Sequence, residues 1–353
     1  MHLSQNSHIA GLQTALSDDQ GVLVNAGFVL GATEFEDIYG SELMSAIEPR
    51  GRLLGPPITV EELEAGSHGW VGDIEALFTG WGGPCLDEKM LSRMPRLRAV
   101  FYGAGTLRFT VTDACWSRGI LFTTAAMQNA IPTAEFAFAM ILLSLKRVWH
   151  HAALAHEIRT FPQHLPLPGS FGSVIGLTSL GQVGYRVARQ LRTLDIKVMA
   201  YDPYASPKLF RKLGVISCSL EELFAHADVV SLHTPLLPET CGMIGGDLLR
   251  LLKPNATFIN TARGALVKEP EFTNFLHSRP DVQAILDVTD PEPPAADSPL
   301  WDLPNVFLTP HIAGSLGFEC RRMGRAMIEE FHRYVRGEPL RFKVTREQLA
   351  RMA

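Results

Sequence analysis

The amino-acid sequence predicts an α/β protein made of two domains, each built around a parallel sheet. Its 353 residues are enough for two domains that each bury a core of their own. In both halves, short apolar runs ending in glycine-rich or alanine-rich turns alternate with segments of helical spacing, as in βαβ units. A Pro/Gly-rich connection at 161–172 separates the two series.

Four expected strands precede this connection. Each leads into a small-residue turn, and segment 86–94, between two of them, has the spacing of a helix. The four strands are expected at residues 21–27, 74–83, 97–105 and 120–125. The polar first 20 residues lack the apolar core of a signal peptide and predict a loosely held extension.

The most apolar stretch of the chain, Ala134–Leu145, predicts a helix. We expect it to be too short to span a bilayer, which takes about 20 residues. Because its apolar residues lie on all sides, it should be buried all round, against its own domain or against a partner subunit.

The second series of strands and helices is cleaner. The expected strands are residues 173–178, 197–202, 214–217, 228–233, 256–260, 282–288 and 305–309. The last helix, at 319–336, is expected to pack back on the first domain. Residues 125–316 would then form one domain inserted into another, which comprises residues 1–124 and 317–353.

Composition narrows the function. An apolar fraction of 46% and a charged fraction of 20% are typical of a soluble globular protein. A net charge of −5 argues against nucleic-acid or anionic-membrane partners. The five cysteines show no metal-binding spacing, and their odd number favours a reducing cytoplasm. No metal site is expected.

A glycine turn follows the expected strand 173–178 and leads into a helical segment. The dinucleotide fingerprint has glycine at its first, third and sixth places, which here are Ser179, Gly181 and Gly184. Gly181 permits close approach of a pyrophosphate, and the helix N-terminus offers free N–H groups. Asp202 ends the next strand, where a carboxylate can accept hydrogen bonds from an adenosine ribose and repel a 2′-phosphate. The pattern predicts NAD binding.

Three titratable or charged residues follow three successive strands of this series. Arg263 comes after the strand at 256–260, Glu292 after that at 282–288, and His311 after that at 305–309. Residues just past the carboxyl ends of parallel strands meet in one crevice. A cation, a carboxylate and an imidazole there form an acid–base site suited to a carbonyl or carboxylate substrate.

With these residues in this order, the chain resembles the D-isomer-specific 2-hydroxyacid dehydrogenases from about residue 21 to 340. The resemblance is carried by YDPY at 201–204, SLHTPLLPET at 231–240, INTARGALV at 259–267, LDVTDPEP at 286–293 and TPHIAGS at 309–315. It implies two Rossmann-like or flavodoxin-like parallel-sheet domains, with the nucleotide-binding domain inserted in the substrate domain. Each catalytic candidate taken alone is ordinary for a strand end, and their joint occurrence favours catalysis.

The resemblance also implies a role for each matched position. Arg263 would clamp the substrate carboxylate, His311 would be the acid–base, and Glu292 would hold its ring. Asp287 would hold the nicotinamide end of the cofactor. The other expected cofactor residues are Gly181, Gln182, Val183, Gly184, Asp202, His233, Thr234, Pro235, Thr261, Ala262, Arg263, His311 and Gly314. Expected substrate residues are Trp81, Ala104, Gly105, Asn129 and Arg263.

The implied activity is NAD-dependent interconversion of a small 2-keto acid and a D-2-hydroxy acid, as in glyoxylate and hydroxypyruvate reductases, by a homodimer. Two alternatives stay open: a phosphoglycerate dehydrogenase-like enzyme, for which Arg108 is a candidate phosphate ligand, and an NADH-binding sensor or corepressor. The chain departs from the family at Ser179 and at 106–113, which lacks the usual aspartate-bearing pattern. Glutamate rather than glutamine at position 292 favours hydroxyacid chemistry over formate oxidation.

Overall fold

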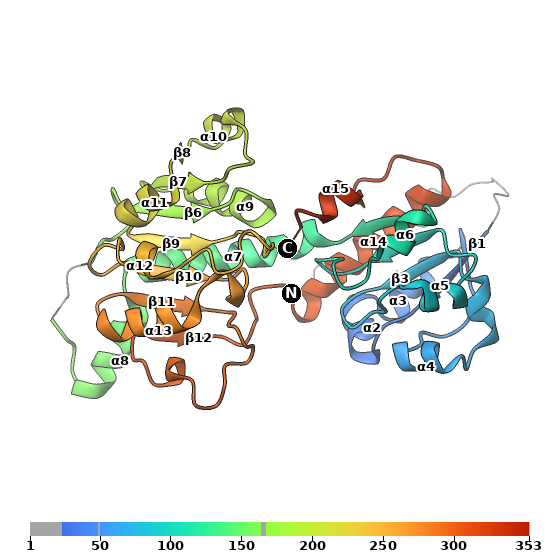
Figure 1. Ribbon diagram of the computed structural model, residues 1–353, viewed down its shortest axis with the longest axis horizontal. Coiled ribbons are helices and arrows are strands. Elements are labelled where there is room, and N and C mark those ends of the chain that lie inside the picture. Colours follow the sequence, from blue (N-terminus) through green and yellow to red (C-terminus); the bar gives the residue numbers. More distant parts are fainter. Residues whose placement is uncertain (1–22, 49, 164–166, 353) are drawn as a thin grey trace, which may run out of the picture.

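A computed structural model describes residues 23–48, 50–163 and 167–352. The chain forms two α/β lobes that lie side by side, joined near α7 (Ala126–Leu145) and α14 (Cys320–Val335) (Figure 1). The extension expected over the first 20 residues, and the first two residues of the strand expected at 21–27, lie outside the described residues.

The first sheet has six strands in the order β13-β5-β4-β3-β1-β2. Its strands are β1 (Val24–Phe28), β2 (Gly51–Leu53), β3 (Ala76–Thr79), β4 (Ala99–Tyr102), β5 (Leu121–Thr124) and β13 (Lys343–Val344). All pairs are parallel except the one between β13 and β5. The order of the parallel strands is that of a flavodoxin-like sheet. The sequence pattern missed β2 and β13, which are too short to show alternation.

Short helices connect these strands. They are α2 (Ala32–Ile38), α3 (Gly40–Ser45), α4 (Val60–Ala65), α5 (Glu88–Arg93), α6 (Asp113–Ser117) and the 3₁₀ turn η1 (Gly69–Asp73). Stacked rings of Phe28, Phe78 and Phe101 form the centre of the core on one face of the sheet. Helix α14 adds Phe331 to this cluster, so it packs back on the first domain as expected.

The second sheet has seven parallel strands in the order β12-β11-β10-β9-β6-β7-β8. They are β6 (Val174–Thr178), β7 (Lys197–Tyr201), β8 (Ile216–Ser217), β9 (Val229–Leu232), β10 (Thr257–Asn260), β11 (Gln283–Leu286) and β12 (Val306–Leu308). Strand order reverses between β6 and β9, as in a Rossmann fold. The expected fold class, two Rossmann-like or flavodoxin-like domains with the nucleotide-binding domain inserted in the other, is confirmed.

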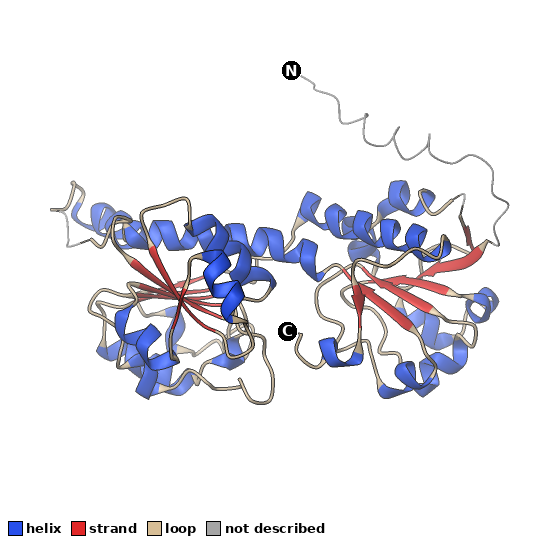
Figure 2. Cartoon of the chain, turned by 90° about the horizontal axis from the view of Figure 1, so that it is seen from above, coloured by secondary structure: helices blue, strands red, loops and turns tan. Residues whose placement is uncertain are grey.

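Helices cover both faces of each sheet (Figure 2). In the second lobe they are α8 (Val148–Ile158), α9 (Gln182–Leu191), α10 (Pro207–Leu213), α11 (Leu220–His226), α12 (Gly246–Leu249) and α13 (Glu269–Ser278). The 3₁₀ turns η2 (Gly264–Leu266) and η3 (Pro299–Trp301) lie in the same lobe, and η4 (Gly317–Glu319) leads into α14. Helix α15 (Arg346–Leu349) follows β13. The helices of the second lobe bury apolar residues on both faces of the second sheet, including Phe258 on one face and Ile259 on the other.

Helix α7 differs from the expectation in two ways. It spans 20 residues and begins at Ala126 rather than Ala134, because Pro132 and its neighbours interrupt the apolar pattern without ending the helix. It is thus long and apolar enough to cross a membrane by length and composition, so the expectation that it is too short is wrong. It is also not buried all round: 33% of its most apolar window is buried, and Leu143 is 37% exposed. Its buried residues pack in the core beside β6, the position of a domain helix.

Candidate active site

The three catalytic candidates follow three neighbouring strands of the second sheet. Arg263 follows β10, Glu292 follows β11, and His311 follows β12, and these strands pair in parallel in the order β12-β11-β10. Their carboxyl ends therefore lie along one edge of the sheet. The topology brings together side chains separated by up to 48 positions in the chain (263 to 311).

The His311 ring is bonded to the Glu292 carboxylate. Nδ1 of His311 lies 2.6 Å from Oε1 of Glu292, and the side chains are 49% and 41% exposed. Because Glu292 occupies Nδ1, Nε2 is left to exchange a proton with a substrate oxygen. A carboxylate bonded to one ring nitrogen fixes the orientation of the imidazole. This pair has the geometry of a general acid–base.

The backbone of His311 is held in an unusual conformation. Its φ is 53°, in the left-handed region that side-chain-bearing residues seldom adopt. Its N–H donates to the carbonyl oxygens of Asp287 and Thr309, at 3.0 Å each. Strained residues of this kind persist where the surrounding structure over-determines them, commonly at active sites.

Asp287 is the residue that holds this turn. It is 1% exposed, and its Oδ1 accepts hydrogen bonds from the Thr309 hydroxyl (2.6 Å) and the Ile312 N–H (2.9 Å). Its Oδ2 accepts from the Ala313 N–H at 2.9 Å. The family resemblance implied that Asp287 holds the nicotinamide end of the cofactor, and in the structure the hydrogen-bond partners of its carboxylate all belong to the segment that carries His311. Sequence reasoning missed Thr309, because a threonine before a proline is common in loops.

Arg263 is positioned by a local network. The buried Asn260 donates from Nδ2 to the Arg263 carbonyl (2.9 Å) and accepts the Ala262 N–H at Oδ1 (3.0 Å). Nη1 of Arg263 donates to the Ala262 carbonyl at 2.6 Å. Burial lowers the pKa of the guanidinium, whereas the nearby charge of Glu292 raises it. Asn260 was not among the expected site residues. The feature of the sequence that could have indicated it is a polar amide side chain at the last position of a fully buried strand.

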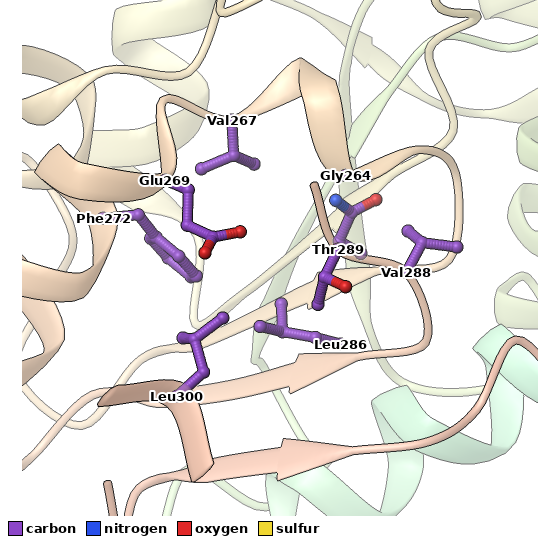
Figure 3. Close-up of a pocket in the computed structure, with 9 residues that line it drawn as sticks. Gly264, Val267, Glu269, Phe272, Leu286, Val288, Thr289 and Leu300 are labelled. Carbon is purple, nitrogen blue, oxygen red and sulfur yellow. The ribbon is translucent and has the colours of Figure 1, made fainter. Parts of the chain in front are cut away.

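The loops that carry Arg263 and Glu292 touch each other at Gly264. A Cβ at this position would lie 2.0 Å from the Thr289 carbonyl carbon and 2.5 Å from the Asp290 nitrogen, so only glycine fits. A cavity with room for about one water lies beneath this contact. Figure 3 shows the Glu269 carboxylate pointing into it, with Gly264 and Thr289 on the opposite wall. Glu269 accepts the Asp290 N–H (3.4 Å), and its pKa is raised by burial.

The glycine turn lies between β6 and α9. Ser179, at the first glycine place, has φ 71°, so the turn keeps the left-handed conformation that glycine would adopt there. A Cβ on Gly184 would lie 2.1 Å from the Ser179 carbonyl oxygen, which explains the glycine at the sixth place. Around Gly181 a Cβ would meet nothing nearer than the Ser179 hydroxyl, at 3.6 Å, so a ligand has room to approach.

Asp202 lies beside this turn, at the end of β7. Its Oδ2 accepts the Leu180 N–H at 2.7 Å and its Oδ1 accepts the N–H groups of Tyr204 (2.9 Å) and Ala205 (3.0 Å). The Ser179 hydroxyl lies 3.4 Å from Oδ2. The carboxylate therefore fixes the turn on one side and its own loop on the other.

Several features of the described residues fit a dinucleotide. The Thr261 hydroxyl is buried without a partner among them. The N–H groups of Gln182 and Val183 at the start of α9 make no hydrogen bond within the described part of the chain, which suits a phosphate. Burial lowers the pKa of His233 to about 4, so its ring is neutral and can wall the site rather than carry a proton. Thr234 and Pro235 follow it past the end of β9, with Thr234 bonded to the Thr178 hydroxyl at 2.9 Å.

Asn129 lies near the start of α7, close to both Gly105 of the first lobe and the segment that follows His311. Its Oδ1 accepts the Ser315 N–H at 2.8 Å. A Cβ on Gly314 would lie 3.3 Å from that oxygen, and a Cβ on Gly105 would lie 3.7 Å from Nδ2. The expected substrate loop at Ala104 and Gly105 thus lies close to the catalytic edge. Trp81, 37% exposed, lies on the neighbouring loop after β3 and has no described contact with the catalytic residues.

Comparison with known proteins places the chain in a family. Residues 138–313 match the NAD-binding domain of the D-isomer-specific 2-hydroxyacid dehydrogenases. A glyoxylate reductase from Korarchaeum cryptofilum is 32% identical over 273 residues, which are 76% of this chain and 82% of that protein. The chain belongs to the D-isomer-specific 2-hydroxyacid dehydrogenase family.

Other members of the family are similar over different lengths. The D-3-phosphoglycerate dehydrogenase of Mycobacterium tuberculosis is 33% identical over 253 residues, 72% of this chain and 48% of that protein. The chain thus spans about half the length of the phosphoglycerate dehydrogenases that it matches. The crystal structure of a D-lactate dehydrogenase from Aquifex aeolicus, complexed with NAD and lactic acid, superposes with a TM-score of 0.68 at 26% identity, covering 89% of this chain and 96% of that one.

Arg108 makes contacts that the sequence did not indicate. It was the candidate ligand for a substrate phosphate, but its Nε donates to the Met352 carbonyl at 2.7 Å and its Nη2 to the Ala350 carbonyl at 3.1 Å. These partners lie more than 240 positions away in the chain. Two of the three guanidinium nitrogens thus hold the main chain of residues 350–352.

Proposed function

We propose that this chain reduces small 2-keto acids to D-2-hydroxy acids, and catalyses the reverse reaction, with NAD as cofactor. The observation that supports this best is the 2.6 Å pair of His311 and Glu292 on the same sheet edge as Arg263. Such an arrangement can hold a carboxylate and transfer a proton to the adjacent carbonyl oxygen. The division into a substrate domain (1–124 and 317–353) and a cofactor domain (125–316) is part of the proposal. It is supported by the two separate sheets.

In this mechanism Arg263 binds the substrate carboxylate and polarises the C2 oxygen. A guanidinium suits this role because it stays charged and can donate two parallel hydrogen bonds. His311, held by Glu292, donates a proton to the C2 oxygen during reduction and accepts it during oxidation. Asp287 and Asn260 keep the two loops in place. The bound nicotinamide would supply or take up the hydride at C2.

The substrate loop of the first domain completes the proposed site. The backbone N–H groups of Ala104 and Gly105 would meet the substrate carboxylate, with Nδ2 of Asn129 as a further donor near them. Because Oδ1 of Asn129 is bonded to Ser315, its amide orientation is set, and Nδ2 is the end left for substrate.

The test of this function is the loss of NADH absorbance with glyoxylate, hydroxypyruvate, pyruvate, phenylpyruvate and 3-phosphohydroxypyruvate. Turnover of glyoxylate or hydroxypyruvate is the expected result. A preference for the phosphorylated substrate would favour the phosphoglycerate dehydrogenase-like alternative, which the engagement of Arg108 with main-chain carbonyls counts against. NADH binding without turnover of any keto acid would favour the sensor or corepressor.

We propose NAD rather than NADP because of Asp202. A 2′-phosphate near this carboxylate would meet like charge. Asp202→Asn is expected to weaken NADH binding about tenfold, the worth of one charge-assisted hydrogen bond, and to raise the affinity for NADPH relative to NADH. Dissociation constants from nicotinamide fluorescence would measure both effects. Asp247→Asn, an exposed carboxylate paired with Arg250, is the matched control. An unchanged ratio of NADH to NADPH affinity would contradict the ribose contact.

A homodimer is also proposed. Helix α8 contains no buried residue, and its apolar side chains Val148 and Ile158 are 38% and 44% exposed. Leu143 of the neighbouring α7 is exposed as well. A second copy of the chain would cover this apolar surface. Sedimentation at micromolar concentration should show a dimer that Leu143→Glu converts to monomer. A monomeric wild-type protein would refute this.

A further inference from the structure

The segment that follows β13, residues 345–352, is anchored firmly on the substrate domain. Leu349 and Met352 pack against the apolar core beneath β3 and β4. Arg108 bonds the carbonyls of Ala350 and Met352, as described above. Arg346 adds an exposed ion pair with Asp113 at 2.7 Å. The course of this segment is therefore set by contacts within the first lobe.

Arg351, within the same segment, contacts the other domain. Its guanidinium carbon lies 5.4 Å from the centroid of the Tyr204 ring, the geometry of a cation–π contact. Tyr204 belongs to the loop after β7, and its N–H donates to Asp202. Figures 1 and 2 both show the chain beyond α15 running between the two lobes. A side chain of the substrate domain thus meets the cofactor domain at the adenosine end of the proposed dinucleotide site.

We propose that residues 345–352 form an interdomain clasp, in which Arg351 on Tyr204 holds the two domains in the arrangement that binds the dinucleotide. The proposal rests on the proposed function for the identity of the ligand. Arg108 is the anchor of this clasp and Arg351 its contact, and both are positioning residues rather than catalytic ones.

The clasp acts through the population of arrangements before the ligand binds. Only molecules whose two domains are already arranged to contact the ligand can bind it. The apparent affinity is therefore the intrinsic affinity multiplied by the fraction of molecules in that arrangement. Tyr204 is 66% exposed, so the contact adds weakly to domain association. An exposed cation–π contact corresponds to about a two- to fivefold change in an equilibrium constant. Loss of the clasp should therefore weaken NADH binding by about that factor, mainly through slower association.

The experiment is a double-mutant cycle on the full chain, with the dissociation constant of NADH as the readout. Arg351→Ala and Tyr204→Ala are each expected to raise it about two- to fivefold. The double variant should be no weaker than Tyr204→Ala, because the two residues act as one contact. Tyr204→Phe keeps the ring and should bind like wild type. Arg346→Ala, which breaks an ion pair of the same segment within one domain, is the matched control and should also bind like wild type.

A second readout needs no ligand. Hydrogen exchange of the amides of Tyr204 and Ala205 and of residues 346–352 should be faster in Arg351→Ala than in wild type without NADH, because the segment loses its partner. Arg108→Ala should give the same result by releasing the anchor.

The outcomes separate the clasp from the proposed function. Wild-type protein that fails to bind NADH would overturn the proposed function, whereas hydrogen exchange would still report the contact. NADH binding that is unchanged or tighter in Arg351→Ala, or an Arg351→Ala effect of equal size on the Tyr204→Ala background, would overturn the clasp while leaving the proposed function intact.

Discussion

Replacing His311 by alanine is expected to lower kcat for keto acid reduction by about 10²–10⁴-fold, the usual contribution of a general acid–base. The structure gives the imidazole one partner, Glu292, and leaves the second ring nitrogen for the substrate. No other group in the proposed mechanism can deliver the proton. Steady-state kinetics with NADH and the best keto acid would measure the loss.

The left-handed backbone of His311 calls for a matched variant. Alanine is strained at φ 53°, so its introduction could disturb the turn and lower activity for structural reasons. Asparagine tolerates this conformation but cannot serve as an acid–base at neutral pH. Both variants should lose activity alike if the imidazole carries the proton. An asparagine variant within a few-fold of wild type would show that the backbone conformation matters rather than the ring.

Replacing Arg263 by lysine is expected to lower kcat/KM by about 10²–10³-fold, which corresponds to about 3–4 kcal/mol of transition-state stabilisation. Lysine keeps the charge but loses the planar pair of donors that can clamp a carboxylate. The Arg263 backbone is extended, at φ −149°, and its side chain makes one local hydrogen bond, to the Ala262 carbonyl. The substitution should therefore leave the thermal midpoint within a few degrees of wild type.

Two controls make this prediction sharp. Lys268→Ala removes a nearby exposed cation that pairs with Glu271 at 3.5 Å, and it should leave kcat/KM within about twofold, as for most surface changes. Arg263→Ala should be partly restored by added guanidinium ions, because the substrate carboxylate and the space for the cation remain. If Arg263→Lys keeps wild-type kcat/KM, a point charge is enough and the bidentate clamp is wrong.

Local patterns in the sequence were sufficient to predict most of the Rossmann-like lobe. Its strands are continuous apolar runs, because both faces of a parallel sheet are buried, and such runs end at the small residues of the turns. The catalytic candidates could be nominated for the same reason, since Arg263, Glu292 and His311 each follow such a run. At Ser179 the sequence departs from the glycine fingerprint, but the backbone conformation of the turn is unchanged. Its φ of 71° reproduces the turn that glycine would form.

The residues that hold the catalytic candidates in place could not be predicted from the sequence. Asp287 matches a family position, and its carboxylate accepts hydrogen bonds from the turn that carries His311. These bonds form only because that turn follows β12, the strand that pairs with β11. Asn260 and Gly264 look like ordinary strand-end residues, and only the approach of the 289–290 backbone explains the glycine. Short elements such as β2 and β13 exist because neighbouring strands pair with them, and two or three residues carry no periodic signal of their own.

The sequence by itself therefore determined the fold class, the family resemblance and the identity of the candidate catalytic groups, because these depend on local periodicity and on residue types at strand ends. The tertiary structure alone decided how those groups are held and how the domains meet. Arg108 with Met352, Asn129 with Ser315 and Arg351 with Tyr204 join residues far apart in the chain. Such pairs leave no local trace, because the distance between their partners is set by the packing of whole elements rather than by neighbouring residues.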